Sequence, residues 1–146
     1  MKINDDIIIG NTNYNLNDIV LNQDGWKGTV LYSNPNPSSG SSITMNLSSG
    51  DWDFLEIYFK SGVCPPSVKV YKDFTTTTLS MCGAYGGTTC QINWRTLTKV
   101  SNTQFTITNS YHYMIKSGSV TWDANATDIF LPVLAIGYKR TNPVEK

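Results

Sequence analysis

The chain has 146 residues, enough for one domain with a sizeable core and too few for two ordinary domains. Charged residues make up 15% of the chain, and eleven Lys and Arg residues balance eleven Asp and Glu residues. This balance argues against binding to nucleic acid or to an anionic membrane. The 45 Asn, Ser and Thr residues lie in short polar stretches between apolar runs, which favours an all-β protein over a helical one.

The N-terminal stretch has a weaker pattern than the rest of the chain. Residues 3–9 predict a short strand, whereas residues 14–21 carry apolar side chains without clean alternation. The stretch lacks the long apolar region and small-residue cleavage site of a secretory signal, so we expect a protein made in a cytoplasm. We interpret residues 1–25 as a candidate attachment arm on a single β-sandwich domain that spans residues 1–146.

The clearest strand covers residues 53–60, where Leu55, Ile57 and Phe59 share one face. Residues 43–48 show the same alternation of apolar and polar side chains. The connector between them, Ser49-Gly50-Asp51-Trp52, has turn chemistry. We therefore expect the two segments to pair as a hairpin at the centre of a sheet.

Further strands are predicted at regular intervals on both sides of this hairpin. Alternation predicts strands over residues 26–33, 67–74, 90–100, 104–109, 111–116, a short one ending at residue 122, and 129–139. Residues 75–78 are all threonine and favour the edge of a strand, and residues 81–87 form a glycine-rich loop. Turns recur about every ten residues, which predicts an all-β, antiparallel two-sheet sandwich of jelly-roll-like type.

The last predicted strand is apolar on both faces, which is typical of a strand buried on both sides or packed against a partner subunit. At an open edge such a strand would promote association. We therefore predict a homo-oligomer, and Pro132 predicts an edge or a bulge in the first half of the strand. The candidate interface residues are Val133, Leu134, Ile136 and Tyr138.

Aromatic residues provide the candidate binding positions. Trp26, Trp94 and Trp122 occupy strand positions that predict a place in the core, whereas Trp52 lies in a turn and Tyr85 in the glycine-rich loop. Exposed rings at Trp52 and Tyr85 would suit a protein interface or a glycan, and ordinary packing is the alternative.

The sequence offers little chemistry for an enzyme. It has one histidine, His112, only two glutamates and no recognisable nucleophile motif. Asp51, Asp53 and Glu56 could supply a pair of glycosidase carboxylates, but aspartate at position 51 is explained by the turn. We therefore predict a non-enzymatic protein without a cofactor.

No metal site is predicted either. Cys64, Cys82, Cys90 and His112 lack the closely spaced cysteine pair of a zinc site, so we expect free thiols, with a Cys82–Cys90 disulfide as the alternative. The loop over residues 123–128 loosely suits calcium, but the bidentate glutamate of the helix-loop-helix motif is missing.

Four segments together resemble the small β-sandwich domains of tailed-bacteriophage structural proteins, found in tail-fibre tips, head fibres and minor virion proteins. They are Val30-Leu31-Tyr32-Ser33, Ile43-Thr44-Met45-Asn46-Leu47-Ser48, Phe54-Leu55-Glu56-Ile57-Tyr58-Phe59 and Ala135-Ile136-Gly137-Tyr138-Lys139. The resemblance spans residues 26–139 and lies mainly in the order of the segments and in the terminal Ile-Gly-Tyr-Lys.

The resemblance implies a trimer in the virion that contacts other virion proteins. Because Met1 stands almost at the domain and leaves no shaft, we expect a capsid decoration or head-fibre component. The alternative is a tail-fibre or receptor-binding protein that contacts a host-surface glycan.

Overall fold

The computed structural model describes residues 6–9, 12–15, 21–23, 25–60, 67–84, 89–123 and 127–141. All regular structure in these residues is β-strand, and they include no helix with the length and apolarity that a bilayer span requires. The strands are β1 (Asp6–Ile9), β2 (Thr12–Asn15), β3 (Leu21–Gln23), β4 (Trp26–Ser33), β5 (Ile43–Asn46), β6 (Phe54–Phe59), β7 (Ser67–Tyr71), β8 (Thr76–Ala84), β9 (Thr89–Ser101), β10 (Gln104–Lys116), β11 (Ser119–Asp123) and β12 (Pro132–Arg140).

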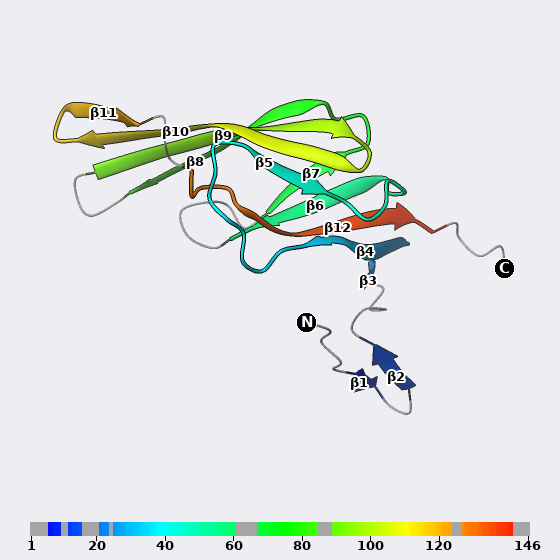
Figure 1. Cartoon of the computed structure of the whole chain (residues 1–146). Helices are drawn as coiled ribbons and strands as arrows, with labels where there is room; N and C mark the ends of the chain where they lie inside the picture. The colour runs from blue at the N-terminus through cyan, green and yellow to red at the C-terminus, as the bar shows by residue number, and fades with distance from the viewer. Residues whose placement is uncertain are drawn as a thin grey trace.

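Two antiparallel sheets pack face to face (Figure 1). Sheet I has the order β3-β4-β12-β6-β7. Sheet II has the order β8-β9-β10, and the other edge of β10 pairs with β5 at one end and with β11 at the other. The predicted two-sheet antiparallel sandwich is confirmed. Its jelly-roll-like feature is that the successive strands β4, β5 and β6 lie in sheet I, sheet II and sheet I, so the chain crosses between the sheets twice.

The N-terminal stretch contributes to two separate pieces of this structure. β1 and β2 form a two-stranded sheet of their own, whereas β3 pairs with β4 and forms an edge of sheet I. The proposed attachment arm over residues 1–25 therefore includes one strand of the sandwich.

Side chains at alternate strand positions fill the space between the sheets. In β6, Leu55, Ile57 and Phe59 are all buried, as the alternation predicts. Gly137 in β12 is paired with Leu55 in the same sheet, and a Cβ at this position would collide with the side chain of Leu31 and with Cβ of Trp52. Glycine at position 137 therefore allows β4 and the connector before β6 to approach β12 closely.

The predicted hairpin between residues 43–48 and 53–60 is wrong. β5 pairs with β10 in sheet II, whereas β6 pairs with β12 and β7 in sheet I. The connector leaves sheet II where the Leu47 amide donates to Thr103, and it joins sheet I where the Asp53 amide donates to Tyr138. Leu47 and Trp52 are buried between the sheets, so the turn-forming residues between them lie on a crossing segment and not on a hairpin.

Two other boundaries differ from the prediction. β8 continues to Ala84, so residues 81–84 of the expected loop belong to a strand, and residues 85–87 lie outside the described residues. The predicted strands at 104–109 and 111–116 are one strand, β10, interrupted by a bulge between Thr108 and Tyr111. The threonine tract does lie in an edge strand, because β8 forms one edge of sheet II.

The last strand lies at the centre of sheet I. β12 pairs with β4 on one side and with β6 on the other, so it has no open edge to protect. The bulge predicted at Pro132 is confirmed by a register shift between Pro132 and Leu134. The apolar character of both faces is explained by a strand whose Ala135 faces the core and whose Ile136 and Tyr138 are buried on the outer face.

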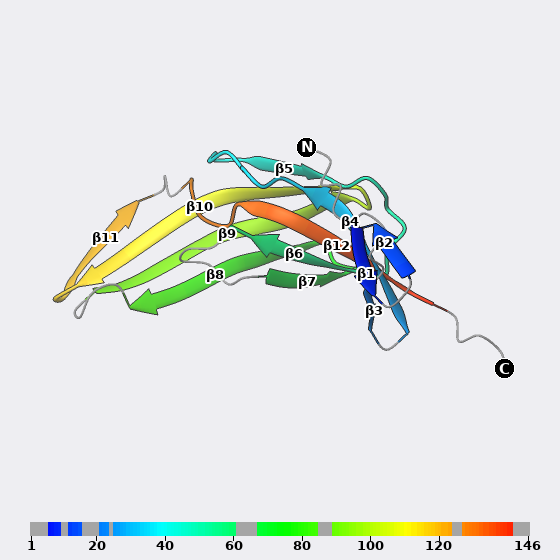
Figure 2. The same ribbon diagram turned by 90° about the horizontal axis from the view of Figure 1, so that it is seen from below.

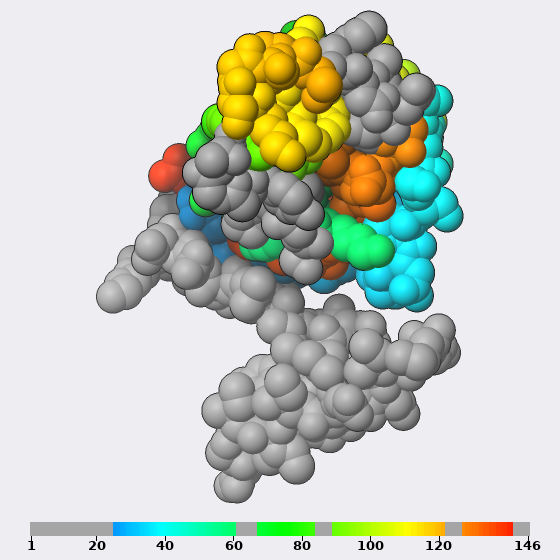
Figure 3. Space-filling model, turned by 90° about the vertical axis from the view of Figure 1, so that its left-hand side faces the viewer, coloured from blue at the N-terminus to red at the C-terminus, as the bar shows by residue number. Residues whose placement is uncertain are grey.

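Arg95 is a charged residue at the centre of the sandwich. Its side chain is fully buried and donates to the carbonyl oxygens of Ile129, Gly40, Ser41 and Ile107 at 2.7 to 3.3 Å. Among the described residues no carboxylate forms an ion pair with it, and burial lowers the pKa of the guanidinium. Arg95 thereby joins β9 and β10 to the segments around residues 40 and 129, which lie side by side in Figure 3 and share a hydrogen bond from Gly40 to Thr127.

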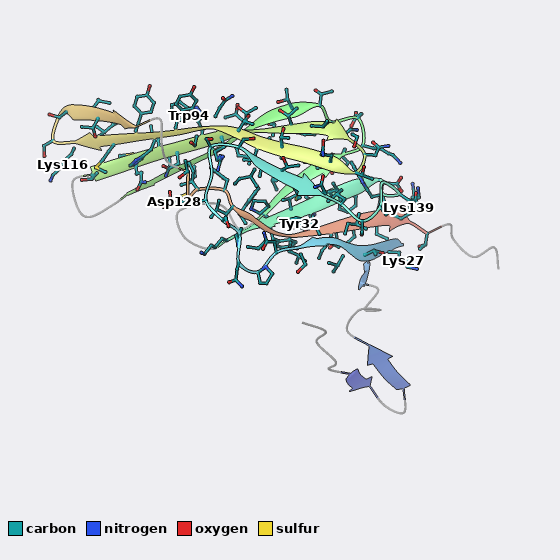
Figure 4. All side chains as sticks on the ribbon, viewed as in Figure 1. Lys27, Tyr32, Trp94, Lys116, Asp128 and Lys139 are labelled. Atoms are coloured by element: carbon teal, nitrogen blue, oxygen red, sulfur yellow. The ribbon has the colours of Figure 1, made fainter. Side chains whose placement is uncertain are left out.

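The two sheets differ in length. β9 and β10 have 13 residues each, and the ends of β8, β9, β10 and β11 project beyond sheet I in both Figure 1 and Figure 2. Lys116 marks the tip of this projection (Figure 4).

Candidate functional site

The bulge in β10 decides which side chains reach the outer face of sheet II. Before it, Thr106 and Thr108 point outward, because Phe105 and Ile107 between them are buried in the core. The bulge adds one residue, with Asn109 at a φ of 54°. Beyond it the outward positions are Tyr111 and Tyr113, which oppose Trp94 and Ile92 of β9.

Hydroxyl groups cover one half of this face in two rows. One row is Thr44, Thr106, Thr98 and Thr76, and the next is Thr108, Thr96 and Thr78. The hydroxyls of Thr76 and Thr98 lie 3.2 Å apart, and Thr76 also donates to the carbonyl of Leu97. The rows therefore present neutral donors and acceptors on four adjacent strands.

An aromatic cluster covers the other half. The Trp94 ring lies 5.0 Å from the Tyr113 ring in a nearly parallel stack and 5.1 Å from the Tyr111 ring. All three side chains are half-buried, and Trp94 stands on the surface of sheet II that faces away from sheet I (Figure 4). We call Trp94, Tyr111 and Tyr113 the Trp94 cluster.

The Trp94 cluster was missed from the sequence, which placed Trp94 in the core. The alternation in β9 did contain this information. Trp94 points to the same face as Thr96 and Thr98, and to the opposite face from the buried Leu97. No comparable signal marks the bulge that turns the two tyrosines to the same face.

Two cysteines lie next to the cluster. Cys82 and Cys90 are free thiols with their sulfur atoms 3.3 Å apart, so the expectation of free thiols is confirmed for these two. A hydrogen bond with Cys82 raises the pKa of the Cys90 thiol. Cys64 lies outside the described residues.

The outer face of sheet I carries a second aromatic cluster, which is centred on Phe54. The Phe54 ring stacks on Tyr138 at 4.6 Å and meets Trp26 edge-on at 5.0 Å. Tyr71 lies 5.9 Å away on the other side, and the ammonium of Lys69 lies 5.7 Å from the centre of the Phe54 ring. These five residues form the Phe54 cluster.

The predicted interface residues of β12 occupy different positions on sheet I. Ile136 and Tyr138 are only 7% and 8% exposed, so one copy already covers most of their surface. Leu134 and Val133 are half-buried. The more accessible apolar side chains on this sheet are Val30 and Tyr71, at 54% and 61% exposure.

Tyr58 also lies on the outer face of sheet I, and its raised pKa predicts that the stability of the fold depends on pH. Burial, with help from a hydrogen bond to Glu56 and its charge, raises the pKa of Tyr58 from 10.0 to about 12, and Glu56 also accepts from Ser67 at 3.0 Å. Because the folded pKa lies above the unfolded one, this contribution to stability is complete below pH 10 and is lost as the pH rises towards 12.

In a tyrosinate absorbance titration we expect late ionisation in the native protein, to which the raised pKa values of Tyr58 and Tyr138 both contribute, and Tyr58→Phe should remove the part nearest pH 12. The control is Tyr71→Phe, which removes an exposed tyrosine from the same face and leaves the Tyr58 hydroxyl in place. A native titration in which every tyrosine ionises near pH 10 would contradict the assignment.

Trp52 and Tyr85 were the predicted binding positions. The prediction for Trp52 is wrong, because its ring is fully buried and its Nε1 donates to the carbonyl of Asn102 at 2.8 Å. Its neighbours Ser49, Gly50 and Asp51 are turn-forming residues, so the local sequence gave no indication that the Trp52 ring lies in the core. Tyr85 lies outside the described residues.

The acidic residues considered for catalysis have other partners. Lys139 lies 2.6 Å from Asp51 and 3.7 Å from Asp53, and a hydrogen bond with Lys139 lowers the pKa of Asp51. Glu56 lies on the outer face of sheet I, in the row of β6 that excludes the buried Leu55 and Ile57.

The polar residues considered for a metal site are separated in the same way. His112 opposes Asn93, in register with the inward-facing positions of β9, whereas Cys82 opposes Ile92 in the outward-facing register. Within the described parts of the chain, no group of three or more His, Cys, Asp or Glu side chains could hold a metal ion. Residues 124–126, which are half of the 123–128 loop, lie outside them.

Comparison with protein-family models found no match, and no curated protein or solved structure matches the chain. The resemblance to bacteriophage domains therefore stays a prediction from the sequence.

Proposed function

We propose that the protein is a non-enzymatic structural component of a bacteriophage virion, a capsid decoration or head-fibre component that assembles through the outer face of sheet I. The observation that supports assembly is the Phe54 cluster, where Trp26, Phe54 and Tyr71 extend an apolar surface on both sides of the buried Tyr138. Aromatic side chains of this kind are enriched at the centres of protein interfaces. The virion assignment is supported by the order of sequence segments over residues 26–139.

The occupant of this face is a second copy of the chain in a closed oligomer, with a trimer favoured by the resemblance. Val30, Tyr71 and the half-buried Leu134 provide the exposed apolar contact, and Lys69 and Glu56 lie beside them as groups that can pair across the interface. Ile136 and Tyr138 act beneath this surface by fixing the positions of Phe54 and its neighbours.

Sedimentation equilibrium tests the assembly. We expect a species of three times the 16.2 kDa chain mass at micromolar concentration. The Val30→Glu variant should dissociate it, because a carboxylate would be buried without a partner. Val100→Glu is the matched control, since Val100 is 56% exposed on sheet II against 54% for Val30.

Two results would count against the proposal. A single well-folded species at 16.2 kDa would remove the assembly through sheet I. Absence of the chain from the mass spectrum of gradient-purified phage particles, made in cells that express it, would remove the virion assignment.

A tail-fibre or receptor-binding role is the second candidate function. It is favoured by the Trp94 cluster, which lies on the face opposite to the proposed assembly surface and so is left accessible in such an oligomer.

A further inference from the structure

We propose that the outer face of sheet II binds a neutral glycan, with the Trp94 cluster as the stacking surface and the threonine rows as hydrogen-bonding partners. The inference rests on the receptor-binding alternative above and does not depend on assembly through sheet I. It assigns to Trp94, Tyr111 and Tyr113 a role that the sequence suggested for Trp52 and Tyr85.

The geometry of the rings supports a sugar ligand. The three rings come from the paired strands β9 and β10, and their separations of 5.0 and 5.1 Å hold each ring in place against its neighbours. Such a group combines a rigid apolar surface with the polar edges of indole and phenol. A pyranose ring has the complementary character, with an apolar C–H face and a rim of hydroxyl groups.

The charge of the face determines the class of glycan. The described outward-facing residues of the threonine rows and the Trp94 cluster are all uncharged, and so are their neighbours Ser80, Cys82, Ile92 and Ile115. A phosphate, nucleic acid or acidic polysaccharide would need Lys or Arg side chains on this face. An uncharged ligand needs only hydroxyl donors and acceptors, which the neighbouring threonine rows provide on four strands.

The bulge in β10 provides an independent argument. If the same residues continued as a regular strand through positions 109 and 110, without a bulge, the two tyrosines would point to the opposite side from Trp94. Bulges of this kind reorient side chains next to binding sites. Here the bulge places Tyr111, Tyr113 and Trp94 together at the border of the hydroxyl rows.

Isothermal titration calorimetry on the full chain tests the proposal. The probes are maltotetraose, cellotetraose, mannotetraose and chitotetraose as neutral ligands, and tetragalacturonate as the acidic one. We expect saturable binding of at least one neutral probe, with a dissociation constant in the micromolar to millimolar range, and no binding of tetragalacturonate. No saturation by any neutral probe up to about 10 mM, or saturation by tetragalacturonate alone, would overturn the proposal.

Variants of the cluster locate the site. Trp94→Ala and Tyr113→Ala should each weaken binding by about tenfold or more, whereas Val100→Ala, six residues farther along β9, should bind like the natural chain. Binding unchanged in both cluster variants would overturn the assignment. Trp94→Phe keeps a ring and the fold, so it should lose less affinity than Trp94→Ala, and it replaces that variant if the alanine chain does not fold.

Sedimentation equilibrium of the same samples separates this proposal from the first one. A Trp94 variant that loses glycan binding but still assembles would support the glycan site on sheet II without affecting the assembly surface on sheet I. A chain that binds glycan but remains a monomer supports the glycan site and contradicts the assembly surface.

Discussion

Trp52→Ala should lower the free energy of unfolding by about 3 to 5 kcal/mol, as is typical when a large buried aromatic side chain is removed. The Trp52 ring is fully buried, lies 6.1 Å from the Phe105 ring and closes the space above Gly137. The substitution also leaves the carbonyl of Asn102 without its donor. Urea denaturation monitored by circular dichroism measures the change.

Two further variants serve as controls for Trp52→Ala. Trp52→Phe keeps most of the volume and should cost much less than the alanine change. Trp94→Ala removes the same side chain from a half-exposed position and should cost about 1 kcal/mol. If Trp52→Ala were no more destabilising than Trp94→Ala, the ring would not be the core element described above.

Arg95→Met should cost about 3 kcal/mol or more, although methionine fits an apolar core. The four carbonyl oxygens that accept from the guanidinium remain after the substitution, and those of Ile107 and Ile129 belong to strongly buried residues. Each buried acceptor that loses its donor costs about 1 to 3 kcal/mol. The same urea denaturation measures it.

Arg140→Met is the control for the Arg95 substitution. Arg140 is exposed and donates to the Asp53 carboxylate from its backbone amide, so its side chain should contribute less than about 0.5 kcal/mol. Equal effects of the two changes would show that the carbonyls around Arg95 are solvated in the variant. The destabilisation caused by Arg95→Lys should lie between those of Arg95→Met and Arg140→Met, because one ammonium cannot reach acceptors on three separate segments.

Local patterns were sufficient to predict most of the strands from residue 26 onward but not how they pair. The burial of Leu55, Ile57 and Phe59 follows from alternation within one segment. The partners of β5 and β6 depend instead on where Leu47 and Trp52 are buried, and the residues between them have the composition of an ordinary turn. The pattern of β12 was recognised as buried on both faces, but a central strand and an interface strand have the same sequence character.

The candidate sites were harder to predict for the same reason. Whether a tryptophan lies in the core or on the surface depends on strand parity relative to the whole sheet, so Trp52 and Trp94 were assigned the wrong way round. Arg95 has no sequence signal, because its four acceptors are backbone carbonyls from segments that lie 12 to 55 residues away in the chain.

The added residue in β10 has a consequence for how this domain can evolve. Deletion of one codon at position 109 or 110 would leave a single residue between Thr108 and Tyr111, so the strand would become regular and Tyr111 and Tyr113 would stay on the outer face. This end of β10 projects beyond sheet I (Figures 1 and 2), so Phe105 and Ile107 would keep their places in the core. One in-frame deletion or insertion at this point could therefore remove or restore the bulge while both the sandwich and the tyrosines on its outer face persist.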